Sequence, residues 1–290
     1  MADLSLLFVA IIWGSTFIIV KQSVESIPVF SFLFMRFALA GILLILINIP
    51  KLKSIDKGVL VDGTMLGMAL FLAYAFQTFA LTATSASITA FLTGLFVVFV
   101  PVLSSVFLKK LPRREAMIGV VLATSGLAFI TIHGKFLLSF GQFLALLCAV
   151  FIALHIILTD KLSRRNDYSL LTLVQVTLVA VFSLIFSLFL DPRVIPIQFN
   201  NQLIFSLIIN SVFATFVAFV IQTSMQKHTT PTKAAIIFIM EPVSSAFFSY
   251  WIGGELLTVK QYIGTSFILL AMVFTEAGTY LKIKREASFV

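Results

Sequence analysis

The chain contains a succession of apolar runs, each close to 20 residues long and separated by short polar or basic segments. About 20 apolar residues, at a rise of about 1.5 Å each, form a helix that crosses a hydrocarbon core of about 30 Å. The runs are continuous and do not alternate between apolar and polar positions, which favours helices over the strands of a membrane barrel. Only 11% of the residues are charged, against about 25% in a soluble domain. We therefore predict an all-α integral membrane protein.

Charged residues, prolines and turn residues divide the apolar runs into ten predicted transmembrane helices. These lie near residues 4–22, 29–49, 60–81, 86–108, 115–132, 139–159, 169–190, 202–226, 232–252 and 258–281.

The basic residues predict the orientation of these helices. The net charge is +8, but the basic residues fall in short clusters between apolar runs and form no single face for nucleic acid. Of the 20 Lys and Arg residues, 15 lie on the side of the two chain ends, four lie on the other side, and Arg36 lies within a span. The positive-inside rule then places both termini in the cytoplasm. We expect a multi-pass protein of the cytoplasmic (inner) membrane.

Two short strings recur in the same order in the two halves of the chain. "AYAFQT" at 73–78 recurs as "AFVIQT" at 218–223, and "FVPVLSS" at 99–105 recurs as "MEPVSSA" at 240–246. Each half contains five predicted spans, and an odd number makes the second half enter the membrane from the opposite side. The repeats predict two inverted five-helix units, residues 1–133 and 134–290.

Three longer strings, taken together and in order, resemble the EamA family of the drug/metabolite transporter (DMT) superfamily. They are "WGSTF" at 13–17, "TSASITAFLTGLFVVFVP" at 84–101 and "EPVSSAFFSYWIGGELLTVKQYIG" at 241–264. The resemblance covers two EamA units, near 4–132 and 139–281. It implies ten helices, an inverted repeat, a central substrate cavity built from both halves, and alternating access.

The first half departs from the family pattern at the end of its fourth predicted helix. Many relatives have a glutamate there, whereas this chain reads "KKLP" at 109–112. The second half keeps the pattern as Gly254-Glu255. No role of an acidic residue is therefore carried over to the first half.

Three formally charged residues lie within the predicted spans: Arg36, Glu241 and Glu276. A charge at the bilayer centre costs at least about 2.5 to 3.5 kcal/mol, so such residues are candidates for function. Glu276 is near the cytoplasmic end of its span, where a structural role is expected. The Arg36 guanidinium is suited to bind a substrate carboxylate. The alternatives for Arg36 are a structural contact with backbone carbonyls or Glu241, and extension toward the outer face.

Glu241 is followed directly by Pro242, near the middle of the ninth predicted span. A proline within a helix frees a backbone carbonyl and creates a polar surface beside the carboxylate. We consider for Glu241 a structural or gating role, proton exchange, and attraction of a cationic substrate group. Pro101 occupies the equivalent place in the first half, with Val100 instead of the acid. We predict a kink or gating role for both prolines.

Uncharged polar side chains complete the candidate substrate site. They are Trp13, Thr16, Tyr74, Gln77, His155 and Gln222. Trp13 and Thr16 are three residues apart, as are Tyr74 and Gln77, so each pair shares a helix face. Because hydrocarbon leaves polar groups unpaired, we expect these side chains to face the protein interior, where hydrogen bonds between helices are the alternative to ligand contact.

These features favour a secondary transporter for a small metabolite, such as an amino acid or a related amphipathic solute. Its expected partners are the substrate and the lipid bilayer; Glu241 makes protons a candidate coupling partner, and the sequence indicates no oligomeric state. A membrane-embedded transferase is the alternative, but it requires clustered acids or histidines. The three His residues are far apart in the sequence. We expect no enzyme activity, catalytic residue, metal or cofactor.

Overall fold

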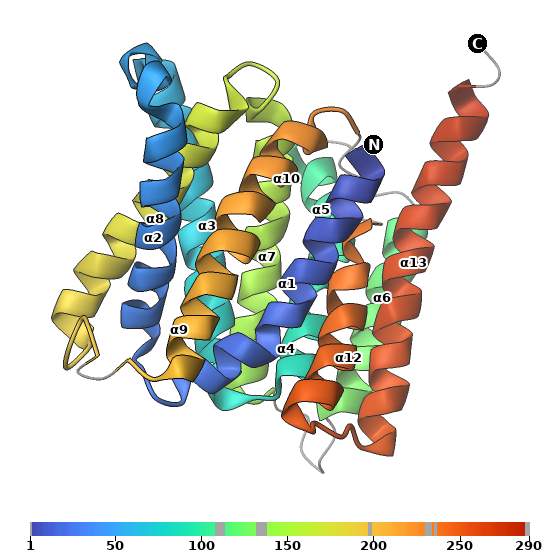
Figure 1. Cartoon of the computed structure of the whole chain (residues 1–290). Helices are drawn as coiled ribbons and strands as arrows, with labels where there is room; N and C mark the ends of the chain where they lie inside the picture. Colours follow the sequence, from blue (N-terminus) through green and yellow to red (C-terminus); the bar gives the residue numbers. More distant parts are fainter. Residues whose placement is uncertain are drawn as a thin grey trace.

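The computed structural model describes residues 2–107, 114–131, 138–196, 199–229, 234 and 237–287, and within these ranges the chain is helical and contains no strand. The elements are α1 (Ala2–Val24), α2 (Val29–Asn48), η1 (Ile49–Ser54), α3 (Lys57–Ala83), α4 (Ala86–Thr93), α5 (Phe96–Phe107), α6 (Arg114–Thr131), α7 (Phe140–Leu162), α8 (Tyr168–Leu190), α9 (Asn201–Ile208), η2 (Ile209–Val217), α10 (Ala218–Gln226), α12 (Met240–Gly253) and α13 (Val259–Ala287). The all-α prediction is confirmed for these residues (Figure 1).

Seven helical stretches within the described ranges are long and apolar enough to cross a membrane. They are Ala2–Val24, Val29–Ser54, Lys57–Ala83, Ala86–Ser104, Phe140–Leu162, Tyr168–Leu190 and Asn201–Gln226. Two shorter apolar helices, Met117–Gly126 and Val259–Phe274, lie within α6 and α13. Many large apolar side chains are exposed on the outside of the bundle, among them Phe189 and Trp251. A bilayer is the solvent in which such a surface is stable.

Several helices begin at a side chain that accepts a hydrogen bond from a free backbone N–H group of the first turn. In α7 the Ser139 hydroxyl and the Gln142 side chain form a reciprocal capping box. Single caps of the same kind begin other helices, at Asp56, Ser85, Asp167 and Asn200. These caps fix where each helix leaves its connecting segment.

The bundle has two ends, which we call the upper and the lower end after Figure 1. The upper end carries the beginning of α1, η1, the α7–α8 connection and the carboxyl end of α13. The lower end carries the α3–α4 and α12–α13 connections. There, Lys21 Nζ donates to the Thr84 carbonyl (2.7 Å), and Ala86 N–H donates to the Glu255 carboxylate (2.9 Å). The two described chain ends therefore lie on one side of the bundle.

Corresponding helices of the two halves run in opposite directions. At the lower end, α1 finishes beside the start of α9, where the Ser23 and Ser206 hydroxyls are 2.6 Å apart. Gly141, at the start of α7, packs against Ala83, at the end of α3. Helix α1 therefore ends at the lower end, whereas α7, its counterpart in the second half, begins there.

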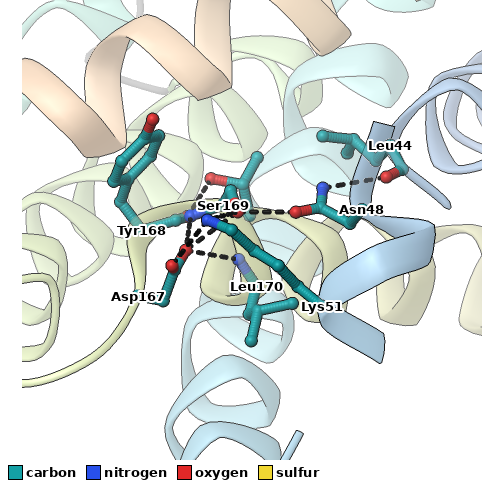
Figure 2. A network of polar contacts seen from close by, with 8 residues as sticks. Leu44, Asn48, Lys51, Asp167, Tyr168, Ser169 and Leu170 are labelled. Carbon is teal, nitrogen blue, oxygen red and sulfur yellow. Dashed lines mark hydrogen bonds and ion pairs between the residues drawn. The ribbon is translucent and has the colours of Figure 1, made fainter. Parts of the chain in front are cut away.

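The helix contacts also keep their pattern when the two halves are exchanged. Helix α1 packs on α12 as α7 packs on α4 and α5, and α3 packs on α7 as α10 packs on α1. The pairs α2–α8 and α6–α13 map onto themselves. Serines near the helix starts join α2 to α8 at both ends: Ser31 Oγ donates to Asp191 (2.8 Å) and Ser169 Oγ donates to Asn48 (2.6 Å; Figure 2).

Two details of the helices differ from the sequence predictions. The helix expected near 86–108 is interrupted by a turn at Gly94 and Leu95, whereas Pro101 lies inside α5. Gly94 allows this turn to approach other helices, since a Cβ atom there would meet Met272 at 2.6 Å. Pro242 stands in the first turn of α12, directly after the helical residues Ile237 and Phe238 and a turn at Ile239. The kink or gating role of Pro242 stays a prediction.

The second difference concerns the eighth predicted span. Residues 202–226 are not one α-helix, because the π-helix η2 lies between α9 and α10. The predicted boundary at 133 and 134, the "KKLP" string and the side chain of Glu276 lie outside the described residues.

Candidate functional site

All eight residues predicted to bind substrate line one cavity between the two halves, which we call the central cavity. They are Trp13, Thr16, Arg36, Tyr74, Gln77, His155, Gln222 and Glu241. They come from α1, α2, α3, α7, α10 and α12. The cavity has an empty volume of about 610 Å³, a figure that includes space open to its surroundings. Neither predicted kink residue, Pro101 or Pro242, is part of the lining.

Arg36 is 2% exposed and is held by neutral groups. Its Nε donates to Thr215 Oγ1 (2.8 Å), and its Nη2 donates to the Tyr74 hydroxyl (3.3 Å) and the Ala214 carbonyl (3.5 Å). The Tyr74 ring lies beneath the guanidinium, 4.7 Å from centroid to Cζ. No carboxylate lies within ion-pair distance of Arg36 in the described part of the chain. The predicted contact with a backbone carbonyl is present, and the alternative ion pair with Glu241 is not.

Glu241 is 5% exposed and begins α12. The positive end of a helix dipole favours a carboxylate in this first turn. Its backbone carbonyl lies against Gly14 of α1, where a Cβ atom would not fit. No described residue makes a hydrogen bond or ion pair with the Glu241 side chain. The cavity therefore contains a guanidinium and a carboxyl side chain that are not paired with each other.

The π-helix η2 supplies the acceptors for Arg36 and Trp13. Thr215 Oγ1 donates to the Asn210 carbonyl, five residues back (2.7 Å), and the Ala214 carbonyl accepts from the Trp13 indole N–H (2.9 Å). Insertions of this type are frequent at functional sites. The sequence analysis missed η2, and its visible signal is the set of polar residues Asn210, Ser211 and Thr215 within an apolar span.

Aromatic rings that the sequence analysis did not select cover the apolar part of the cavity. Phe96, Phe219 and Phe238 belong to the lining. The Trp13 ring lies 5.4 Å from that of Phe219 and 5.6 Å from that of Phe238, in tilted arrangements. The indole N–H bond to η2 holds Trp13 in this cluster. Phenylalanines are too numerous in the sequence for these three to be distinguished by pattern.

The remaining predicted residues differ in how they are hydrogen-bonded. His155 Nε2 is 2.8 Å from Gln175 Oε1. The Nε2 atom of the same Gln175 side chain lies 3.4 Å from Thr223 Oγ1. Gln222 Oε1 is buried and has no hydrogen-bond partner. Thr16 donates to the Trp13 carbonyl of its own helix (2.8 Å). His155 thus joins a network between helices, while Gln222 has an acceptor available inside the protein.

Comparison with known proteins places the chain in a family. Residues 1–132 and 139–276 match the EamA-like transporter family. The chain belongs to this family. An uncharacterized transporter of Archaeoglobus fulgidus is 35% identical over 275 residues, which cover 95% of this chain and 85% of the relative. The uncharacterized transporter YoaV of Bacillus subtilis is 24% identical over 97% of this chain and 98% of its own length.

A solved crystal structure supports the fold of this EamA family member. It has a TM-score of 0.67 at 18% sequence identity and matches 94% of this chain and 95% of its own chain. At this identity the likeness concerns the fold alone. The family and the apolar helices together establish a multi-pass membrane protein of a transporter family. Within the residues that the structure covers, no three His, Cys, Asp or Glu side chains form a group able to hold a metal ion.

Proposed function

We propose that the protein is a secondary transporter that carries a small zwitterionic solute, an amino acid or a related amphipathic compound, across the cytoplasmic membrane. The observation that carries this proposal is that Arg36 and Glu241 line the same cavity without forming an ion pair. A solute with a carboxylate and an ammonium group would neutralise both charges at once. The family supports transport as the activity.

The two charges suit the two ends of such a solute. The Arg36 guanidinium has donors in a planar fork, which matches a carboxylate. Glu241 would accept from the ammonium group, and the free Gln222 Oε1 offers a further acceptor. Trp13 and the phenylalanines around it provide an apolar surface for the rest of the solute.

The fold supports transport by alternating access in two inverted repeats. We propose ten membrane crossings, two units at 1–133 and 134–290, and both termini in the cytoplasm. The opposite directions of corresponding helices and the exchange symmetry of their contacts support the repeat. Lys51, Arg164 and Arg165 gather at the upper end, which we assign to the cytoplasmic side. The solute gradient alone, or protons exchanged at Glu241, would drive the cycle.

The test is ligand-induced thermal stabilisation of the purified protein over a panel of metabolites. A ligand that binds the folded state at about 100 times its Kd adds about 2.7 kcal/mol of stability. For each amino acid that stabilises, its amide and its N-acetyl derivative serve as matched controls. We expect both derivatives to lose the stabilisation, because each removes one of the two charges. Equal stabilisation by a derivative would contradict the zwitterion site, and absence of counterflow of any stabilising solute in proteoliposomes would contradict transport.

A further inference from the structure

Polar side chains of α7 continue the wall of the central cavity toward the upper end. Ile152, His155 and Ile156 belong to the cavity lining. Thr159 and Ser163 follow on the same face of the helix, one and two turns later. Thr159 is 0% exposed and Ser163 is 2% exposed.

Helix α10 continues the opposite wall in the same way. Phe219 and Gln222 line the cavity, and Gln226, 0% exposed, follows on the same face. Gln226 Nε2 donates to the Ile156 carbonyl of α7 (2.9 Å), which brings the two polar rows together. At the upper end Arg164 Nη2 donates to the Thr229 carbonyl (3.3 Å). The two helices are thus joined at the height of Ile156, and the segments that follow them are joined again at the upper end.

Five oxygen atoms along this α7–α10 interface are buried and have no hydrogen-bond partner. They are Thr159 Oγ1, Ser163 Oγ, Gln222 Oε1, Gln226 Oε1 and Thr229 Oγ1. A buried polar group without a partner costs about 1 to 3 kcal/mol. Several threonines elsewhere bond to their own helix; for example, Thr172 donates to the Tyr168 carbonyl four residues back (2.8 Å). Single unpaired threonine hydroxyls also occur at Thr93 and Thr177, but the interface of α7 and α10 gathers five such oxygens. Along this interface another partner is needed.

We propose that a file of water molecules fills this interface, which we call the polar seam, and connects the central cavity with the upper end. Hydroxyl and amide oxygens are suitable hosts, since a buried water makes about three hydrogen bonds. The seam gives Gln222 and His155 contact with water and protons from the upper end while the helices stay packed. The argument for water in the polar seam depends neither on the identity of the transported solute nor on the proposed transport activity.

Silver ion, which is small enough for a narrow file of water and reacts with thiolates, tests the seam. The single cysteine, Cys148, is first replaced by alanine. In this background Thr159→Cys and Ser163→Cys place a thiol in the seam, and Ala153→Cys places one in the apolar core of the same helix, where Ala153 is 0% exposed. The protein is reconstituted in liposomes, treated with silver ion, then unfolded and alkylated, and the blocked fraction is measured by mass spectrometry.

We expect both seam thiols to be blocked at least about tenfold faster than the thiol at position 153, because thiolates form where water is present. Equal rates at all three positions would overturn the proposal and indicate that the hydroxyls bond to their own helix. Fast reaction at 163 with slow reaction at 159 would overturn the connection to the cavity.

A second variant tests the path directly. Gln226→Leu places an apolar side chain at the height of Ile156, between the cavity and the outer part of the seam. The thiols of Thr159→Cys and Ser163→Cys both lie on the upper-end side of this height, so Gln226→Leu should leave their silver reaction unchanged. Added to Gln222→Cys, whose thiol lies at the cavity end of the seam, it should slow the reaction several-fold. Slowing at 159 or 163, or no slowing at 222, would contradict a water file that connects the upper end with the cavity.

Discussion

Arg36 and Thr215 join the two halves of the protein through one hydrogen bond of 2.8 Å, from the guanidinium Nε to the threonine hydroxyl. Thr215 in turn donates to the Asn210 carbonyl, five residues back in the π-helical segment η2. The buried cation is therefore oriented by an irregular segment of a helix from the other half. The position of the Arg36 guanidinium, which we propose binds the solute, therefore depends on the local conformation of η2.

Thr215→Val should weaken solute binding without preventing folding. Valine has the same shape but removes the acceptor for Arg36, and a hydrogen bond to a charged group contributes about 1.5 to 3 kcal/mol. We expect the KM for transport to rise about tenfold or more, since about 1.4 kcal/mol corresponds to a factor of ten. Thr215→Ser keeps the hydroxyl and should retain the KM. An unchanged KM in Thr215→Val would show that η2 does not position Arg36.

Glu241→Gln should impair transport more than membrane insertion. The amide keeps the size of the side chain and removes the charge that we assign to the solute ammonium group or to proton exchange. Uptake and counterflow across a range of pH in reconstituted vesicles measure the effect. Glu25→Gln is the matched control, because Glu25 is exposed. Unchanged transport at every pH in Glu241→Gln would remove both roles.

The sequence predicted the residues of the cavity better than the helices that hold them. Polar groups inside an apolar span must face the protein interior, so Trp13, Gln77 and Glu241 could be selected from the sequence alone. The prediction needed no knowledge of which helices pack together. The helix directions also followed from two short repeated strings, because an odd number of spans inverts the second half.

The irregular elements could not be predicted because their causes lie in other helices. The turn at Gly94 packs against Met272 and Pro242, which are far away in the sequence. Glu255 accepts from the backbone N–H groups of Ala86 (2.9 Å) and Ser87 (3.1 Å), and so caps a helix of the other half. Local sequence patterns report propensity within one segment, and these features depend on contacts between segments.

Gly14→Ala should separate α1 from α12 beside the cavity. A Cβ atom at Gly14 would lie 2.8 Å from Ser244 Cβ and would also meet the Glu241 backbone carbonyl. Overpacking of this kind costs about 1 to 3 kcal/mol, so we expect a lower melting temperature of the purified protein. Gly41→Ala is the matched control, because its nearest neighbour would be Thr177 Oγ1 at 3.7 Å, an ordinary contact. Equal melting temperatures for the two variants would contradict the close approach of α1 and α12.

The ion pair between Lys51 and Asp167 at the upper end predicts a dependence of stability on pH. Lys51 Nζ lies 2.8 Å from the Asp167 carboxylate, which also accepts from the backbone N–H groups of Ser169 and Leu170 (Figure 2). Partial burial favours the neutral acid, but the hydrogen bonds from Lys51 and Ser169 outweigh it and lower the pKa of Asp167 from 3.8 to about 2. Because the pKa in the folded state lies below that of the unfolded chain, these contacts stabilise the protein above about pH 4. Their contribution is lost as the pH falls from about 4 to about 2.

Asp167→Asn removes the negative charge of residue 167 and keeps its ability to cap the start of α8. Asparagine begins a helix as well as aspartate does, so the variant should lose only the contribution of the negative charge, about 1 kcal/mol or less for a partly exposed pair. We expect the melting temperature of Asp167→Asn to be lower than that of the wild type at pH 7, with a difference that shrinks in high salt and disappears as the pH approaches 2. Asp167→Ala should lose the cap as well and melt lower at every pH. If the difference between wild type and Asp167→Asn were the same at pH 7 and pH 3, the carboxylate would not be titrating between these values, and the ion pair would contribute nothing to the joint between α2 and α8.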